Sequence, residues 1–167
     1  MLEDLPEVES FTRFSFPVDK FVKYQGTAQQ ESFMFADSSL FRVFSFPLAY
    51  GNPTSALTQP NSVAISERIA QKYFGKDNPL GQTLNIRLGD KFEPYEVTAV
   101  YENIPSGSTI QTDFFLSMHK QTLGKDKAYM ANPDVTLWYV SSFQTYVLLK
   151  ENAVANRMDK KLASFRA

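Results

Sequence analysis

A dense series of helix caps, prolines and glycines runs through residues 36–81 and limits each element there to a short length. Asp37 has a carboxylate suited to accept hydrogen bonds from the free backbone N–H groups at the start of a helix, so it is predicted to be an N-cap. The helix after it is predicted to bury one apolar face, and the prolines and glycine at 47–53 end it. A second helical turn is predicted over residues 54–57. The apolar face consists of Leu40, Phe41 and Phe44.

The second half of this segment predicts a strand followed by a capped helix. Residues 62–65 are predicted to form the strand and residues 67–74 the helix, with Ser66 as the N-cap between them. Gly75 is the expected residue after the helix, because glycine adopts the left-handed backbone conformation that commonly ends helices. Gly81 follows a turn and is predicted to need a backbone angle closed to other residues. These patterns describe architecture and carry no catalytic chemistry.

Alternating apolar and polar residues predict a strand-rich chain on both sides of this segment. Aromatic residues make up 14% of the sequence, with 15 Phe and 8 Tyr, and such side chains pack well on pleated sheets. Residues 82–88 and 96–102 are predicted to pair as a hairpin across Gly89 and Asp90. The remaining predicted elements are strands at 8–16, 20–24, 30–35, 110–118 and 138–150, loops at 104–108 and 121–134, and an amphipathic helix at 152–165.

Composition and charge exclude several classes of site. Seventeen Lys and Arg residues stand against 18 Asp and Glu residues, a net charge of −1 without a long basic run, so nucleic-acid binding is not expected. The chain has no Cys, which rules out disulfides, thiolate metal sites and a cysteine nucleophile. His119 is the single histidine, so a histidine-based metal site is not expected. No apolar run reaches the roughly 18 residues needed to span a bilayer.

Few residues remain for acid–base chemistry. Glu93, Glu96 and Glu102 fall in strands or loops, where exposed charges are usual, and Asp113 is isolated in the sequence. Carboxylates that perform acid–base catalysis come in facing pairs with separated pKa values, and no such pair is evident. The sequence therefore predicts no catalytic, cofactor-binding or metal-binding residues. A hydrolase that uses Asp113 or a glutamate with His119 is the enzymatic alternative.

Six stretches of the sequence carry a family resemblance. They are LPEVESFTRF at 5–14, ADSSLFRVFSFPLAYGNPTSAL at 36–57, NSVAISERIAQKYFGKDNPLGQTL at 61–84, YEVTAVYENIPSGST at 95–109, TDFFLSM at 112–118 and TYVLLKENAVANRMDKKLASF at 145–165. They are spread along nearly the whole chain and resemble the periplasmic core domain of MacB/FtsX-like ABC transporter permeases, in the form common in Bacteroidetes.

The resemblance implies an α+β fold, a mixed sheet with a βαβ-type Porter-like subdomain and an inserted Sabre-like subdomain. Residues 37–108 are expected to form the insert and residues 1–36 plus 109–167 the Porter-like part of a single periplasmic core domain fragment, 1–167. The family's opening strand and most of its first helix are expected to be missing at the N-terminus. In such permeases the domain lies on the periplasmic side of the inner membrane, between the first two transmembrane helices.

The implied function is non-catalytic: the domain transmits ATP-driven motion of the membrane helices to substrate or partner proteins, in export, efflux or lipoprotein release. ATPase activity would belong to a separate cytoplasmic subunit or domain, and no cofactor is expected. The implied partners are that cytoplasmic ABC ATPase, a second permease copy or homologous domain, and a periplasmic or outer-membrane protein. A stand-alone periplasmic module that binds a peptide, lipid or sugar in an aromatic groove is the alternative, and it predicts a large apolar pocket.

Overall fold

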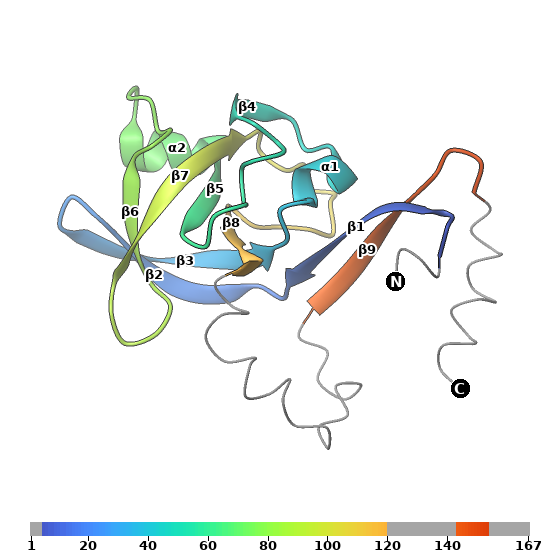
Figure 1. Ribbon diagram of the computed structural model, residues 1–167. Helices are drawn as coiled ribbons and strands as arrows, with labels where there is room; N and C mark the ends of the chain where they lie inside the picture. The colour runs from blue at the N-terminus through green and yellow to red at the C-terminus, as the bar shows by residue number, and fades with distance from the viewer. Residues whose placement is uncertain (1–4, 120–142, 154–167) are drawn as a thin grey trace, which may run out of the picture.

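The structure is a computed structural model, and it describes residues 5–119 and 143–153 (Figure 1). The predicted loop at 121–134, the start of the predicted strand at 138–150 and nearly all of the predicted helix at 152–165 lie outside these residues. None of the helices in the described part is long and apolar enough to cross a membrane. The described elements are β1 (Val8–Ser15), β2 (Val18–Tyr24), β3 (Thr27–Ala36), α1 (Leu40–Phe44), β4 (Leu48–Gly51), β5 (Ser62–Ser66), α2 (Glu67–Phe74), β6 (Thr83–Arg87), β7 (Glu93–Tyr101), β8 (Phe114–Ser117) and β9 (Phe143–Leu149).

One mixed sheet contains all of these strands, and part of it closes on itself. The strand order is β2-β6-β7-β5-β8-β3-β1-β9, with β4 added to β7. Because β2 pairs with both β6 and β3, the six strands from β2 through β3 form a closed ring (Figure 1). The β3–β8 and β5–β7 pairs are parallel and the other pairs of the ring are antiparallel. The expected α+β fold with a mixed sheet is confirmed.

The ring encloses the first hydrophobic core, because alternate residues of each strand point inward. β5 is buried along its whole length: Val63 and Ile65 face this core while Ala64 faces a second one. Such burial on both faces is typical of a central strand. The first core contains Val22, Phe33, Phe35, Val63, Ile65, Ile69, Phe74, Leu84, Ile86, Tyr95, Val97, Val100, Phe114, Leu116 and Met118.

The second core lies under α1 and is rich in aromatic rings. Phe41 packs against Tyr101 and Phe115, and Phe44 packs edge-on against Tyr146 of β9 with ring centroids 5.1 Å apart. Phe14 of β1 stacks on the same tyrosine ring at 4.9 Å. The short helix therefore joins the ring to the two outermost strands.

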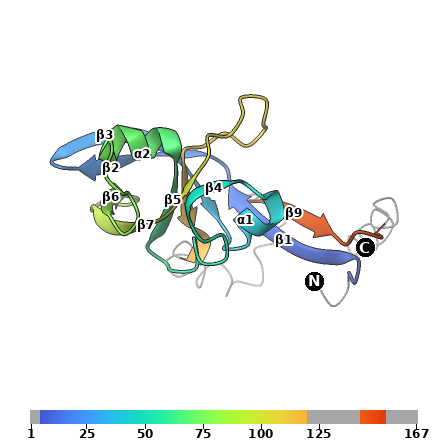
Figure 2. The same cartoon turned by 90° about the horizontal axis from the view of Figure 1, so that it is seen from above.

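Those two strands, β1 and β9, form a ribbon that extends away from the ring (Figure 2). They are antiparallel, with Val8 opposite Leu149 at the outer end and Ser15 opposite Phe143 at the inner end. By contrast, strand pairing between β1 and β3 is limited to Phe14 opposite Ala36. The start of β1 and the end of β9 therefore lie side by side at the outer end of the ribbon.

The elements predicted in the middle of the chain are present, although β7 begins at Glu93, earlier than the predicted residue 96. α2 spans the predicted residues, the Ser66 hydroxyl accepts from the Ile69 N–H at 3.3 Å, and Gly75 follows with φ +61°. The helical turn at 54–57 is present, because the Ala56 N–H donates to the Asn52 carbonyl at 3.0 Å. The predicted hairpin is the β6–β7 pair. The predicted strand at 110–118 is shorter than expected, since β8 holds four residues.

The structure contradicts the predicted role of Asp37. Ser39 occupies the N-cap position of α1 and makes no side-chain capping hydrogen bond. The Asp37 carboxylate instead accepts three hydrogen bonds from Arg13, from its backbone N, Nε and Nη2, each 2.9 Å long. A guanidinium fork binds both oxygens of a carboxylate, and such charged, bidentate contacts are stronger than a single cap on a five-residue helix.

Strand β4 occupies residues where the sequence predicts only the end of a helix. It pairs antiparallel with β7, Leu48 opposite Tyr101 and Gly51 opposite Ala99. Three of its four residues are exposed, so it has no apolar alternation from which a strand could be predicted. Gly51 has φ +98°, and a Cβ there would lie 2.6 Å from the Thr98 carbonyl oxygen. Glycine is therefore what allows β4 to lie this close to β7.

Candidate functional site

Asp113, the carboxylate of the hydrolase hypothesis, is not isolated in the fold. The Ser66 hydroxyl donates to its Oδ1 at 2.6 Å, and Arg68 forms an ion pair with its other carboxylate oxygen, Oδ2. Ser66 is also the N-cap of α2, so the carboxylate holds the start of that helix in place. The arrangement is a structural network rather than a paired acid and base.

The structure separates Asp113 from His119. All four residues of β8 lie between them, and a strand of that length spans roughly 13 Å at about 3.3 Å per residue. A general base must lie within hydrogen-bond reach of the group that it activates. Glu93, Glu96 and Glu102 are exposed along or just after β7. Among the described residues, no group of three His, Cys, Asp or Glu side chains is arranged to hold a metal ion.

The buried Tyr101 and the half-buried Tyr73 act as hydrogen-bond donors. The Tyr101 hydroxyl donates to the Thr112 carbonyl at 3.0 Å, and burial, together with the charge of Asp113, raises the pKa of this tyrosine. The Tyr73 hydroxyl donates to Glu31 at 2.7 Å, and its pKa is raised by burial and then by Glu31. Both rings therefore stay neutral at physiological pH and serve the fold.

Three polar side-chain contacts fasten the ribbon to α1 and to the turn before it. The first is the Arg13–Asp37 pair, in which the hydrogen bond to the carboxylate raises the pKa of the guanidinium. The second is the Ser39 hydroxyl, which donates to the Phe11 carbonyl at 2.6 Å, and the third joins Arg42 Nη2 to the Ser10 hydroxyl at 2.7 Å. All three cross from β1 to α1 or its leading turn, so the ribbon and the helix are fixed together.

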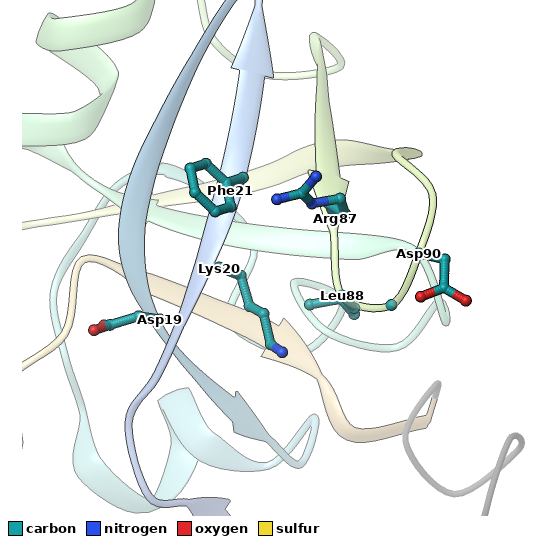
Figure 3. Close-up of a pocket in the computed structure, with 7 residues that line it drawn as sticks. Asp19, Lys20, Phe21, Arg87, Leu88 and Asp90 are labelled. Atoms are coloured by element: carbon teal, nitrogen blue, oxygen red, sulfur yellow. The ribbon is translucent and has the colours of Figure 1, made fainter.

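A pocket of about 360 Å³ opens between β2 and the loop after β6 (Figure 3). The Arg87 guanidinium lies over the ring of Phe21, 4.6 Å from its centroid, and 5.4 Å from the centroid of Phe92. The sequence gives no signal for this cluster, because the strands that bring it together, β2 and β6, are far apart along the chain. The lining residues are Asp19, Lys20, Phe21, Arg87, Leu88, Gly89 and Asp90.

A second pocket, of about 340 Å³, lies beside the start of β7. Like the first, it is lined mainly by polar and charged residues. The large apolar groove that a stand-alone binding module predicts is not among these two pockets of the described surface. The second pocket is lined by Gln59, Asn61, Ser62, Thr83, Pro94, Tyr95, Glu96 and Thr98.

Solved structures with the same fold come from transport proteins. A domain of a protein assigned as a permease from Porphyromonas gingivalis is 22% identical, with a TM-score of 0.73 over 96% of this chain and 70% of that one. The periplasmic region of MacB from Actinobacillus actinomycetemcomitans is 14% identical, with a TM-score of 0.66 over 99% of this chain and 72% of that one. The extracellular domain of the noncanonical ABC-type transporter YknZ from Gram-positive bacteria is 15% identical, with a TM-score of 0.60 over 95% of this chain and 76% of that one.

The family is identified by comparison of the sequence with protein-family models. Among curated proteins none matches the chain. The family model of the MacB-like periplasmic core domain, however, matches residues 1–165 and so confirms the resemblance that the six stretches indicate. The chain belongs to the family of MacB-like periplasmic core domains, which are components of ABC transporter permeases.

Proposed function

We propose that this domain transmits ATP-driven movement of permease membrane helices to substrate or partner proteins on the periplasmic side of the inner membrane. It does so without catalysis of its own, and ATP hydrolysis takes place in a separate cytoplasmic ABC ATPase. A second permease copy or homologous domain and a periplasmic or outer-membrane protein are the other proposed partners. Family membership supports the setting, a permease, while the transmission role rests on the architecture of the ribbon.

The observation that carries the proposal is the way in which β1 and β9 join the body. Their outer ends lie side by side, with Val8 opposite Leu149, so movements of the flanking segments arrive at one place. The Arg13–Asp37 pair and the aromatic stack of Phe14 on Tyr146 then tie the ribbon to the rest of the fold. A ribbon fixed in this way turns as one piece with the ring and α1.

The division into 1–36 plus 109–167 and 37–108 remains a proposal. What supports it is that β1 and β9, from the two terminal segments, form a ribbon of their own. Strands of both segments nevertheless share one sheet, since β8 pairs with β5 as well as with β3. We therefore expect the two segments to move together.

Cysteine crosslinking in the intact permease tests the transmission role. The chain has no native Cys, so Val147→Cys on β9 and Tyr50→Cys on β4, both exposed, each introduce one reporter thiol. We expect the yield of crosslinks between two permease copies to differ at least twofold between the ATP-free and ATP-bound states at one of these positions. Equal yields in both states at both positions would refute the proposal. A permease whose ATPase cannot bind ATP is the control.

The gene that encodes the domain offers a simpler test. A permease domain of this kind requires flanking apolar segments of about 20 residues. An open reading frame without such segments on either side would contradict the proposal before any crosslinking is done.

A further inference from the structure

We propose that the pocket between β2 and the β6–β7 loop binds a carboxylate on an acidic segment of a partner protein, with Arg87 as its anchor. This goes beyond the proposed function, because such a binding site exists whether or not the domain moves with ATP hydrolysis.

Among the residues that the structure describes, the Arg87 guanidinium is held by aromatic rings and has no charged partner. It stacks on Phe21 and lies close to Phe92, at 4.6 and 5.4 Å from the ring centroids. Within residues 5–119 and 143–153 it makes no hydrogen bond or ion pair. Stacking uses the face of a guanidinium and leaves the N–H groups at its edge available for a bidentate acceptor. Since the side chain is already ordered by the rings, less conformational entropy is lost when an anion binds.

The charges around the pocket favour a ligand that places one carboxylate in the site. Lys20 and Arg87 line it together with Asp19 and Asp90, so the formal charge of the lining is zero. In Figure 3 the Asp19 and Asp90 carboxyl groups point away from the Arg87 guanidinium, which itself is directed toward Phe21. A polyphosphate, a nucleic acid or an anionic membrane needs an excess of clustered basic residues. A single carboxylate needs one oriented cation.

An exposed aromatic ring beside the guanidinium favours a protein segment over a free anion. Phe21 is 37% exposed although it is a large apolar side chain on a strand. It offers contact area to an apolar side chain next to the bound carboxylate, and aromatic and arginine residues together are typical of the energetic centre of protein interfaces. The occupant that fits is an extended segment in which Glu or Asp alternates with apolar residues.

The experiment uses a capped pentapeptide in which two glutamates alternate with three valines, and a matched peptide with glutamine in place of glutamate. Binding to the ¹⁵N-labelled 167-residue chain is followed through the Nε–H signal of Arg87 and the amide signals of residues 19–21 and 87–90. We expect saturable shifts with the glutamate peptide and a Kd at least tenfold weaker with the glutamine peptide. Equal shifts with both peptides, or none with either, overturn the proposal.

Variants of Arg87 distinguish a role in peptide binding from a purely structural role in supporting the β6–β7 loop. Arg87→Gln is expected to weaken binding at least tenfold, and Arg87→Lys, which keeps the charge but not the planar fork, by severalfold. Lys76→Gln, which removes an exposed charge outside the pocket, is expected to change the Kd less than twofold. If Arg87 only braces the loop, its variants will lower the melting temperature and leave peptide binding unchanged, which overturns the proposal.

Other anions give the remaining outcomes. Inorganic phosphate and phosphatidylglycerol vesicles are titrated under the same conditions. Weaker binding of both than of the glutamate peptide supports a carboxylate site, whereas tighter binding of either one overturns it. Loss of ATP-dependent crosslinking would leave these results untouched, so failure of the proposed function and failure of this inference are distinguishable.

Discussion

Among the glycines that the structure describes, Gly51 is the one where an added methyl group meets the greatest obstruction. In Gly51→Ala the new Cβ would lie 2.6 Å from the Thr98 carbonyl oxygen, 2.8 Å from Ala99 Cα and 2.9 Å from Ala99 Cβ. Two of these atoms belong to the backbone of β7, which is buried in the ring and cannot turn aside as a flexible side chain can. Either β4 moves away from β7 or the backbone of the ring distorts.

The size of the effect follows from a matched control, Gly81→Ala. Gly81 has φ +76°, yet an added Cβ would have no heavy atom within 4 Å, so its substitution measures the conformational cost alone. A non-glycine residue in the left-handed region costs about 1–2 kcal/mol. Overpacking against a well-packed neighbour costs about 1–3 kcal/mol more. We therefore expect a loss of about 1–2 kcal/mol for Gly81→Ala and about 2–5 kcal/mol for Gly51→Ala.

Urea unfolding followed by circular dichroism measures both losses, and amide hydrogen exchange in β4 shows where the strain is relieved. A change in midpoint without a change in the m-value indicates that only stability has changed. Equal losses in the two variants, together with unchanged exchange protection in β4, would falsify the argument from close contact.

Two further predictions concern charged and titrating groups. Asp37→Asn is expected to lower stability by about 1–2 kcal/mol, a range reduced because the Arg13 side chain is 41% exposed. In a double-mutant cycle with Arg13→Gln the coupling is expected to be about 1 kcal/mol, and strictly additive losses would contradict a direct pair. Burial raises the pKa of Tyr101 above that of an unfolded tyrosine, about 10, so stability present below pH 10 is lost as the pH rises further. Urea unfolding at pH 8 and pH 11 is expected to show a smaller loss for Tyr101→Phe than for the natural chain; an equal loss would assign the pH dependence to other groups.

Local signals in the sequence predict local structure well. The bounds of α2 could be predicted because Ser66 and Gly75 act within one helical turn of their own positions. Asp37 carries an equally clear local signal, but the prediction of an N-cap is wrong, since its partner Arg13 lies 24 residues earlier. A carboxylate chooses between a nearby cap and a distant guanidinium according to the tertiary fold, and the sequence around it does not show which one is near.

The ring and the pocket also depend on contacts between residues that lie far apart in the sequence. Alternation predicts β2 as a strand, but nothing in its residues indicates that it pairs with β3 on one side and β6 on the other. Phe21 and Arg87 come together only because of that second pairing, in which they lie opposite each other. The family resemblance predicts the fold class and the permease setting, whereas the pocket depends on the pairing of β2 with β6, which no local sequence pattern indicates.

The antiparallel ribbon also determines how the domain responds to load. The hydrogen bonds between its strands lie perpendicular to the strands, and the segments before β1 and after β9 both join the ribbon at the end where Val8 lies opposite Leu149. If the two flanking segments were pulled apart, these hydrogen bonds would break in sequence, beginning with the pair nearest the pulled end. If the segments move in concert along the strands, the two strands are not displaced relative to each other and the ribbon moves as a rod. The proposed transmission role therefore requires paired, in-phase displacement of the two segments.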